Sequence, residues 1–150
     1  MQIKLTNCKE YTEVDPIDYE KHHVFNWHKN GDGYAIRKSN KKCKFLHREI
    51  LAPNKGLFTD HINGNKLDNR RCNLRVATAQ QNAFNQRGVN GKTKGVTWVA
   101  KRRKWQAQAK LNYKTYWLGY FSELDDALLA YDNFAKKHYG RYAKTNGGRA

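Results

Sequence analysis

Apolar and polar residues alternate strictly between positions 104 and 111, and this is the clearest pattern along the chain. The apolar positions are Trp105, Ala107 and Ala109, and the polar positions are Gln106, Gln108 and Lys110. A period of two predicts a strand with one buried face and one open face. The runs 95–99 and 114–121 predict a strand on each side of it, so a three-stranded antiparallel sheet is expected here.

A helix is predicted after this sheet, from Glu123 to Tyr139, with Ser122 as its N-cap and Asp125 three residues later. Residues at helical spacing form one stripe along it: Ala127, Ala130, Tyr131, Phe134, Ala135 and His138. We expect this stripe to pack on the apolar side of the sheet. A single helix covers one side only, so the polar side of the sheet is expected to stay open.

The middle of the chain predicts a strand, a turn and a second strand within a short span. Residues 57–59 form a β-prone run that ends at Asp60, and a strong turn signal lies at 63–65. Residues 73–76 then return as the second strand.

A capping box follows the second strand, because Gln81 stands three residues after Thr78. A helix is therefore expected to begin at Ala79, with Gly88 as its stop. Upstream, the patterns predict a strand at 2–5, a helix opened by Pro16 through 17–25, a hairpin around the turn 30–33, and a short apolar-periodic piece at 45–51.

The polar segment 86–92 has no apolar period and is predicted to be a linker. We therefore expect two domains, 1–90 and 91–150, in an α+β fold. The chain has 29 Lys and Arg against 13 Asp and Glu, a formal net charge of +16 over 150 residues. The excess is spread over both predicted domains, and such a field attracts polyanions, of which nucleic acid is favoured.

A membrane is not expected as a partner, because no apolar run reaches spanning length and no basic amphipathic helix stands out. The first residues lack the apolar core of a signal peptide. Cys8, Cys43 and Cys72 are widely spaced and form no Cys-x-x-Cys pair, so neither a zinc site nor a disulfide framework is predicted. These patterns favour a cytoplasmic protein with reduced thiols.

Asp60, His61, Asn73 and Asn82 bring a carboxylate, an imidazole and two carboxamides to the predicted strand-turn-strand-helix segment. An acid and an amide oxygen suit a hard divalent cation that keeps positions open for water and a phosphate. A neutral histidine beside the cation can take a proton from a water. Each residue alone fits a turn former or a surface histidine, but the joint pattern favours phosphodiester hydrolysis.

Residues 11–86 resemble the HNH homing-type endonucleases of phages. The matching residues are Val14-Asp15, Asp18-Tyr19, Trp27, Leu46-His47-Arg48 and the long run from Asp60-His61-Ile62-Asn63 to Asn73-Leu74-Arg75. Residues 92–146 are similar to the Apetala-type, or ethylene-response-factor, DNA-binding domain of plant regulators. The matching pieces are Lys94-Gly95-Val96, Lys104-Trp105, Trp117-Leu118-Gly119-Tyr120-Phe121, Ala130-Tyr131-Asp132 and Asn146.

The nuclease resemblance implies a ββα-metal finger in which Asp60 is a metal ligand and His61 the general base. It implies that Asn73 braces the loop and helps to hold the base. Asn82 stands where many HNH enzymes have a final histidine, and this harder ligand favours Mg²⁺ over zinc or nickel. The arginines expected to steady the phosphate backbone are Arg70, Arg71 and Arg75.

The expected function is therefore that of a sequence-directed, metal-dependent endonuclease that acts on double-stranded DNA without a small-molecule cofactor, in a bacterial or phage-infected cell. The second domain is expected to recognise the target sequence, with its sheet in the major groove. Phosphate contacts are expected from Lys94, Arg102, Arg103 and Lys104. Base or sugar contacts are expected from Gln106, Gln108, Lys110, Thr115 and Trp117.

Two other functions fit parts of the sequence. A DNA-binding regulator with an inactive nuclease domain is the alternative, although the intact set of Asp60, His61, Asn73 and Asn82 argues against it. An RNA-binding protein fits the charge but not the finger. His47 lies outside the finger and is expected to be structural or to contact phosphate. The target sequence, the number of strands cut and the oligomeric state are left open by the sequence.

Overall fold

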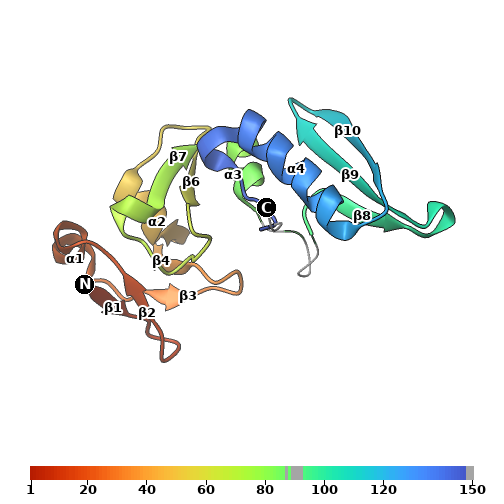
Figure 1. Ribbon diagram of the computed structural model, residues 1–150. Helices are drawn as coiled ribbons and strands as arrows, with labels where there is room; N and C mark the ends of the chain where they lie inside the picture. The colour runs from red at the N-terminus through yellow and green to blue at the C-terminus, as the bar shows by residue number, and fades with distance from the viewer. Residues whose placement is uncertain (87, 89–92, 148–150) are drawn as a thin grey trace. The chain divides into compact units, whose positions relative to one another are not determined.

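Figure 1 shows the computed structural model, which describes residues 1–86, 88 and 93–147. The chain forms two compact units, residues 1–82 and 83–150. Each unit combines helices with antiparallel strand pairs, so the mixed α and β composition expected from the sequence is confirmed.

The first unit is built from short elements. In chain order they are β1 (Gln2–Lys4), β2 (Tyr11–Glu13), α1 (Pro16–His22), β3 (His28–Lys29), β4 (Ala35–Ser39), β5 (Lys42–Phe45), α2 (Leu46–Leu51), β6 (Phe58–His61), β7 (Leu74–Ala77) and the first part of α3 (Ala79–Asn85). The strands pair antiparallel as β1–β2, β3–β4–β5 and β6–β7. The helix predicted over 17–25 ends earlier, because the His22 carbonyl accepts from the Phe25 N–H and from the Trp27 indole.

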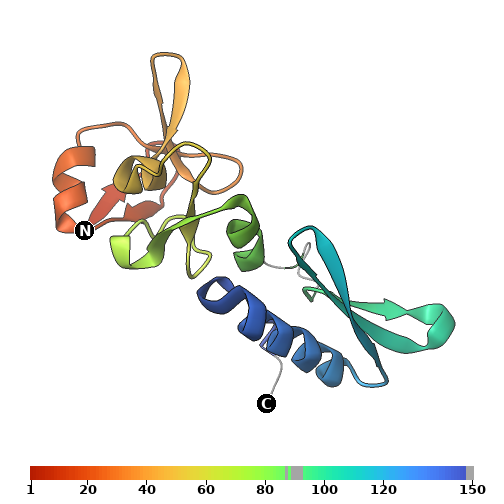
Figure 2. The ribbon, with the colours of Figure 1, turned by 90° about the horizontal axis from the view of Figure 1, so that it is seen from above.

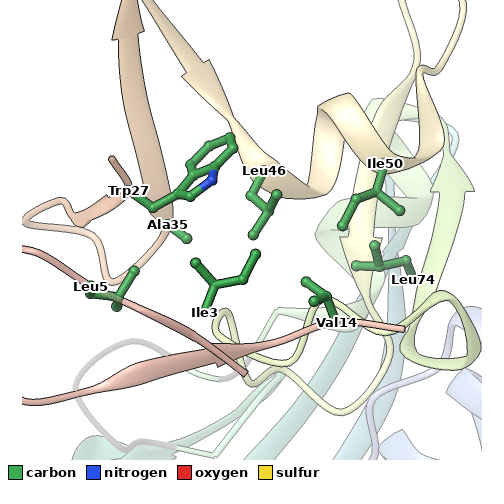
Figure 3. Packing of buried hydrophobic residues seen from close by; sticks show 8 residues of the cluster. All are labelled: Ile3, Leu5, Val14, Trp27, Ala35, Leu46, Ile50 and Leu74. Atoms are coloured by element: carbon green, nitrogen blue, oxygen red, sulfur yellow. The ribbon is translucent and has the colours of Figure 1, made fainter. Parts of the chain in front are cut away.

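One hydrophobic core joins most of these elements (Figure 3). Its buried members are Ile3, Leu5, Val14, Trp27, Ala35, Leu46, Ile50 and Leu74. The Trp27 indole N–H donates to the His22 carbonyl at 2.8 Å, so burial of this large ring leaves its polar atom satisfied. The core therefore ties the hairpin β1–β2 to strand β7.

The hairpin β1–β2 also holds the loop between β6 and β7. The Glu13 N–H donates to the Leu67 carbonyl, and the Asn69 N–H donates to the Glu13 carbonyl, both at 2.8 Å. The Thr12 hydroxyl donates to the same Leu67 carbonyl at 2.8 Å, across 55 positions of sequence. A strand near the N-terminus thus fixes a loop in the middle of the chain.

The expected order of strand, strand and helix is present in β6, β7 and α3. Strand β6 extends beyond its predicted end, because Asp60 pairs with Arg75 and His61 with Leu74 in the ladder. The sequence predicted that Asn73 begins the second strand, but the structure places it at the end of a 3₁₀ turn.

The capping box at the start of α3 is confirmed. The Thr78 N–H donates to Gln81 Oε1 at 2.9 Å, and the Gln81 N–H donates to Thr78 Oγ1 at 3.2 Å. The helix begins at Ala79 as predicted and ends at Asn85, before Gly88.

The second unit contains the three-stranded antiparallel sheet that the alternation predicts. Its strands are β8 (Val96–Val99), β9 (Lys104–Leu111) and β10 (Lys114–Phe121), with β9 in the middle. Helix α4 (Leu124–Tyr139) packs along one side of this sheet (Figure 2). Ala107 and Ala109 are buried beneath it, as expected for small residues under a closely packed helix.

Two details of α4 differ from the sequence predictions. The N-cap is Glu123 without a side-chain cap bond, so the predicted cap at Ser122 is wrong. His138 is exposed, and the buried stripe consists of Ala127, Leu128, Tyr131, Asp132, Ala135 and Tyr139. The Tyr139 hydroxyl donates to the Lys110 carbonyl at 2.9 Å, and this bond turns Tyr139 toward the sheet in place of His138.

The end of α3 belongs to the second unit, so the division of the chain falls inside a helix and before the predicted boundary at residue 90. The Phe84 ring stacks on the Tyr139 ring with centroids 3.7 Å apart. The Lys94 ammonium donates to the carbonyls of Ala83, Phe84 and Gln86 at 2.9, 2.5 and 2.8 Å. Most of the predicted linker, residues 87 and 89–92, lies outside the described residues.

Candidate active site

Asp60 and His61 occupy the last two positions of β6, and both are buried, with 6% and 5% of their surface exposed. The Asp60 carboxylate faces Arg75 across the ladder and accepts from its guanidinium through Oδ2, at 2.8 Å from Nε and 2.7 Å from Nη2. The predicted metal ligand is thus a buried carboxylate whose charge is balanced by an arginine on the neighbouring strand.

The His61 ring is held by Asn69, with its Nε2 3.1 Å from Asn69 Oδ1. It also packs against two other rings, His47 and Tyr34, at centroid distances of 5.0 and 5.9 Å. Burial lowers the pKa of His61 more than the Asn69 hydrogen bond and the Asp60 charge raise it. The ring is therefore kept in its neutral form near pH 7, the form that can accept a proton.

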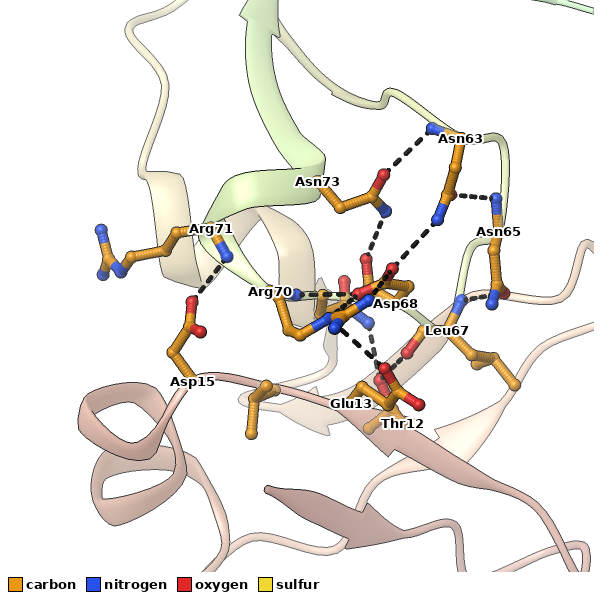
Figure 4. Close-up of polar contacts among 12 residues, drawn as sticks. Thr12, Glu13, Asp15, Asn63, Asn65, Leu67, Asp68, Arg70, Arg71 and Asn73 are labelled. Carbon is orange, nitrogen blue, oxygen red and sulfur yellow. Dashed lines mark hydrogen bonds and ion pairs between the residues drawn. The ribbon is translucent and has the colours of Figure 1, made fainter.

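Asn73 closes the loop that follows His61 (Figure 4). Its Oδ1 accepts from the Asn63 N–H at 3.0 Å, and its Nδ2 donates to the Asp68 carbonyl at 2.8 Å. Its own carbonyl accepts from the Ile62 N–H at 2.8 Å. The side chain of Asn73 therefore braces the loop, and the Asn69 side chain forms a hydrogen bond with the His61 ring.

Asn82 lies in the first turns of α3, where its N–H donates to the Thr78 carbonyl at 2.9 Å. The side chain is half-buried. The capping box fixes the start of this helix, so it also fixes the direction in which Asn82 leaves the backbone.

All three arginines of the finger that were expected to steady phosphate form ion pairs within the protein. Arg70 is bidentate to Asp68 at 2.8 Å for both bonds, and Arg71 is bidentate to Asp18 at 2.7 and 2.8 Å. The Arg71 N–H also donates to Asp15 Oδ2 at 2.7 Å (Figure 4). Together with the pairing of Arg75, these bonds place each guanidinium group against a buried carboxylate, while Arg70 and Arg71 each keep 46% of their side-chain surface exposed.

His47 is buried next to His61 and the Tyr34 ring. Burial is the main cause that lowers the pKa of His47 to about 3, so the ring is neutral at physiological pH. Its Nδ1 has no hydrogen-bond partner among the described residues. A neutral, enclosed ring supports a structural role for His47. It does not favour a phosphate contact that relies on a positive charge on the ring.

The residues that the sequence missed are Thr12 and Asn69, which are both fully buried. Asn69 lies in the long family-like run, but nothing in its spacing set it apart from the other asparagines of the loop. Thr12 stands in strand β2 and had no local signal at all. Their connection to His61 appears only in three dimensions.

In the second unit, the polar residues proposed for base or sugar contact share one face of the sheet. Gln108 lies opposite Trp117 in the ladder and Lys110 lies opposite Thr115, while Gln106 alternates in phase with them along β9. Paired residues of an antiparallel ladder point to the same side, so these five residues define what we call the open face. Trp117 is 53% exposed on it.

The basic residues near this face differ in their surroundings. Arg102, Arg103 and Lys104 are exposed around the turn from β8 to β9, and Arg102 stacks over the Tyr120 ring at 4.8 Å. Lys94 instead donates to three carbonyls at the end of α3, which occupies its ammonium within the unit. These three bonds use all the N–H donors of the Lys94 ammonium.

Comparison with known proteins relates the ββα segment and its buried Asp-His pair to nucleases. Residues 52–84 match a family model described as HNH endonuclease. Over 129 residues the chain is 30% identical to the uncharacterized HNH endonuclease L560 of Acanthamoeba polyphaga mimivirus, covering 81% of this chain and 67% of that protein. The chain belongs to the HNH endonuclease family.

Protein 3.8 of Escherichia phage T7 is a second relative, 36% identical over 55 residues. That match covers 35% of this chain and 46% of the phage protein, so the chain spans about half of that relative's length. No solved structure matches the chain. Within the described residues, no helix is long and apolar enough to cross a membrane.

Proposed function

We propose that this protein is a metal-dependent DNA endonuclease that hydrolyses phosphodiester bonds at sites chosen by its second unit. The observation that carries the proposal is the buried pair Asp60-His61 at the end of β6, inside the segment that matches the HNH model. The His61 ring is neutral and held in place by Asn69, as a general base requires. Family membership supports DNA as the substrate.

Each polar residue of the finger has a proposed part in the reaction. His61 takes a proton from the attacking water, while the loop braced by Asn73 keeps the end of β6 from moving relative to β7. The arginine pairs Arg71–Asp18 and Arg70–Asp68 support this loop from outside. Positioning of this kind matters because small displacements of a catalytic group cost large factors in rate.

The donor chemistry of Asp60 and Asn82 fits a hard divalent cation, most simply Mg²⁺, with water and a DNA phosphate as its other ligands. When bound there, such an ion supplies Lewis-acid stabilisation of the negative charge on the scissile phosphate and the leaving oxygen. Among the residues that the structure describes, no group of three or more His, Cys, Asp or Glu side chains is placed to hold a metal. A site formed by one acid and one amide is consistent with that finding.

The open face of the second unit is the proposed reader of DNA sequence, in the manner of the Apetala-type domains that residues 92–146 resemble. Its amides can donate to and accept from base edges, and the exposed Arg102, Arg103 and Lys104 beside it are suited to phosphate. The large positive charge of the chain supports binding to a polyanion.

Cleavage of supercoiled plasmid with and without Mg²⁺ tests the proposal. The wild-type protein should nick or linearise the plasmid only when Mg²⁺ is present. His61→Ala should lose about 10²- to 10⁴-fold in rate and keep its DNA affinity, because the base acts on water and not on the DNA. Cleavage by His61→Ala at the wild-type rate would remove His61 from the mechanism.

A DNA-binding regulator with an inactive nuclease is the second candidate. One observation favours it: the Arg75 guanidinium donates twice to Asp60 Oδ2 and so competes with any cation for that oxygen. If the plasmid stays intact at every Mg²⁺ concentration while a DNA shift assay shows tight binding, this second function is correct.

A further inference from the structure

Three hydrogen bonds in series connect a backbone carbonyl to the His61 ring. The Leu67 carbonyl accepts from the Thr12 hydroxyl at 2.8 Å. Asn69 Nδ2 donates to Thr12 Oγ1 at 2.7 Å, and Asn69 Oδ1 lies 3.1 Å from His61 Nε2. With its proton on the Leu67 carbonyl, which can only accept, the Thr12 hydroxyl accepts from Asn69 through its oxygen.

The orientation of the Asn69 amide follows from the same contacts. Its Nδ2 has an acceptor for each hydrogen, Thr12 Oγ1 at 2.7 Å and the Lys66 carbonyl at 3.4 Å. A flipped amide would place its oxygen against the Lys66 carbonyl, and it would keep the Thr12 contact only by drawing the hydroxyl proton away from the Leu67 carbonyl. Oδ1 therefore faces His61, and only a proton on Nε2 makes that contact a hydrogen bond.

Burial makes this arrangement strict. Thr12 and Asn69 have no exposed surface, and His61 is 5% exposed. Bulk water cannot replace a missing partner at such a depth, so a buried polar group left unsatisfied costs about 1–3 kcal/mol. The described direction of the chain is favoured, because reversing it would set the Asn69 amide oxygen against the Lys66 carbonyl.

We propose that Thr12 and Asn69 are positioning residues that keep the proton of neutral His61 on Nε2 and its lone pair on Nδ1. The inference rests on the proposed nuclease function, in which a proton taken from water must then enter at Nδ1. Thr12 lies in β2, outside the residues 52–84 that match the family model. A strand of the N-terminal hairpin therefore sets the tautomer in which His61 acts as the base.

The tautomer of His61 can be measured directly by ¹⁵N NMR on the full chain, without metal or DNA, at a pH where the ring is neutral. The His61 signals are assigned by their loss in His61→Gln. Wild-type protein should show a protonated Nε2 and an unprotonated Nδ1. A dominant proton on Nδ1 overturns the proposal, and this result needs no variant of the relay.

Three threonine variants then separate the relay from general stability. Thr12→Val removes the hydroxyl and should give a mixture of tautomers, with single-turnover cleavage slowed about 10- to 100-fold and an unchanged Kd for DNA. Thr12→Ser should restore both. Thr59→Val is the matched control, because Thr59 is buried in β6 and its hydroxyl has no hydrogen-bond partner among the described residues. A Thr12→Val protein with the wild-type tautomer and rate overturns the proposal.

The two proposals fail in different ways. Wild-type protein that holds the proton on Nε2 but never cleaves DNA contradicts the nuclease function and leaves the relay standing. An active enzyme with the proton on Nδ1 contradicts the relay alone.

Discussion

Replacing Arg75 by methionine tests whether Asp60 is available to a cation. Asp60 and Arg75 have 7% and 10% of their side-chain surface exposed, so their pair counts as buried. Removing one partner of a buried ion pair costs about 3–5 kcal/mol, because the remaining charge has lost water as well as its partner. That loss would be a large part of the total stability of a unit of this size.

Mg²⁺ should reverse part of this loss if Asp60 is a metal ligand. A cation that binds only the folded state stabilises it by about 1.4 kcal/mol at ten times its Kd. Urea unfolding of Arg75→Met should therefore give a free energy of unfolding that rises with Mg²⁺, and the rise should exceed that of wild type because no guanidinium competes for Oδ2.

Two controls make the measurement specific. Arg71→Met breaks the pair with Asp18, whose side chain is 1% exposed, and should lose stability without recovering it in Mg²⁺. Adding Asp60→Asn to Arg75→Met removes the negative charge and should abolish the Mg²⁺ effect. An Arg75→Met protein with the same free energy of unfolding in EDTA and in Mg²⁺ would refute the reasoning that places a cation on Asp60.

Three further results are expected from the second unit. Gly95→Ala should lower its melting temperature, because φ is +72° there and a Cβ would overlap the neighbouring aromatic ring of α4; unchanged melting would contradict the close packing. Burial lowers the pKa of Lys94 to about 8, so between about pH 8 and 10.5 the unfolded chain binds more protons than the folded one and the free energy of unfolding should rise with pH. Lys94→Met should remove this rise, and identical pH profiles of the variant and the wild type would contradict it. Alanine at Gln108 and Lys110 should weaken site preference more than nonspecific cutting, whereas Lys136→Ala on α4 should not; an unchanged footprint of the double variant would exclude the open face as the reader.

Local patterns in the sequence determined the elements that depend on neighbours in the chain. The capping box from Thr78 to Gln81 was readable because both of its bonds join residues three positions apart. The alternation around Ala107 was readable because a strand has a period of two, and it correctly divided the sheet into a covered and an open face. The pair Asp60-His61 was singled out by its place in the predicted strand-turn-strand-helix segment, which lies within the residues that match the HNH model.

The tertiary structure alone decided which partners those side chains take. The sequence did not reveal that Arg70 and Arg71 pair with the carboxylates of Asp68 and Asp18. Asp18 comes from α1, 53 positions away from Arg71. The Asn69–Thr12 bond spans 57 positions and has no periodic signature. Charge and spacing reveal what a side chain can bind, whereas the packing of distant segments into one core determines which groups lie next to it. The proposed proton position on His61 therefore depends on the packing of β2 against the loop, which no local pattern contains.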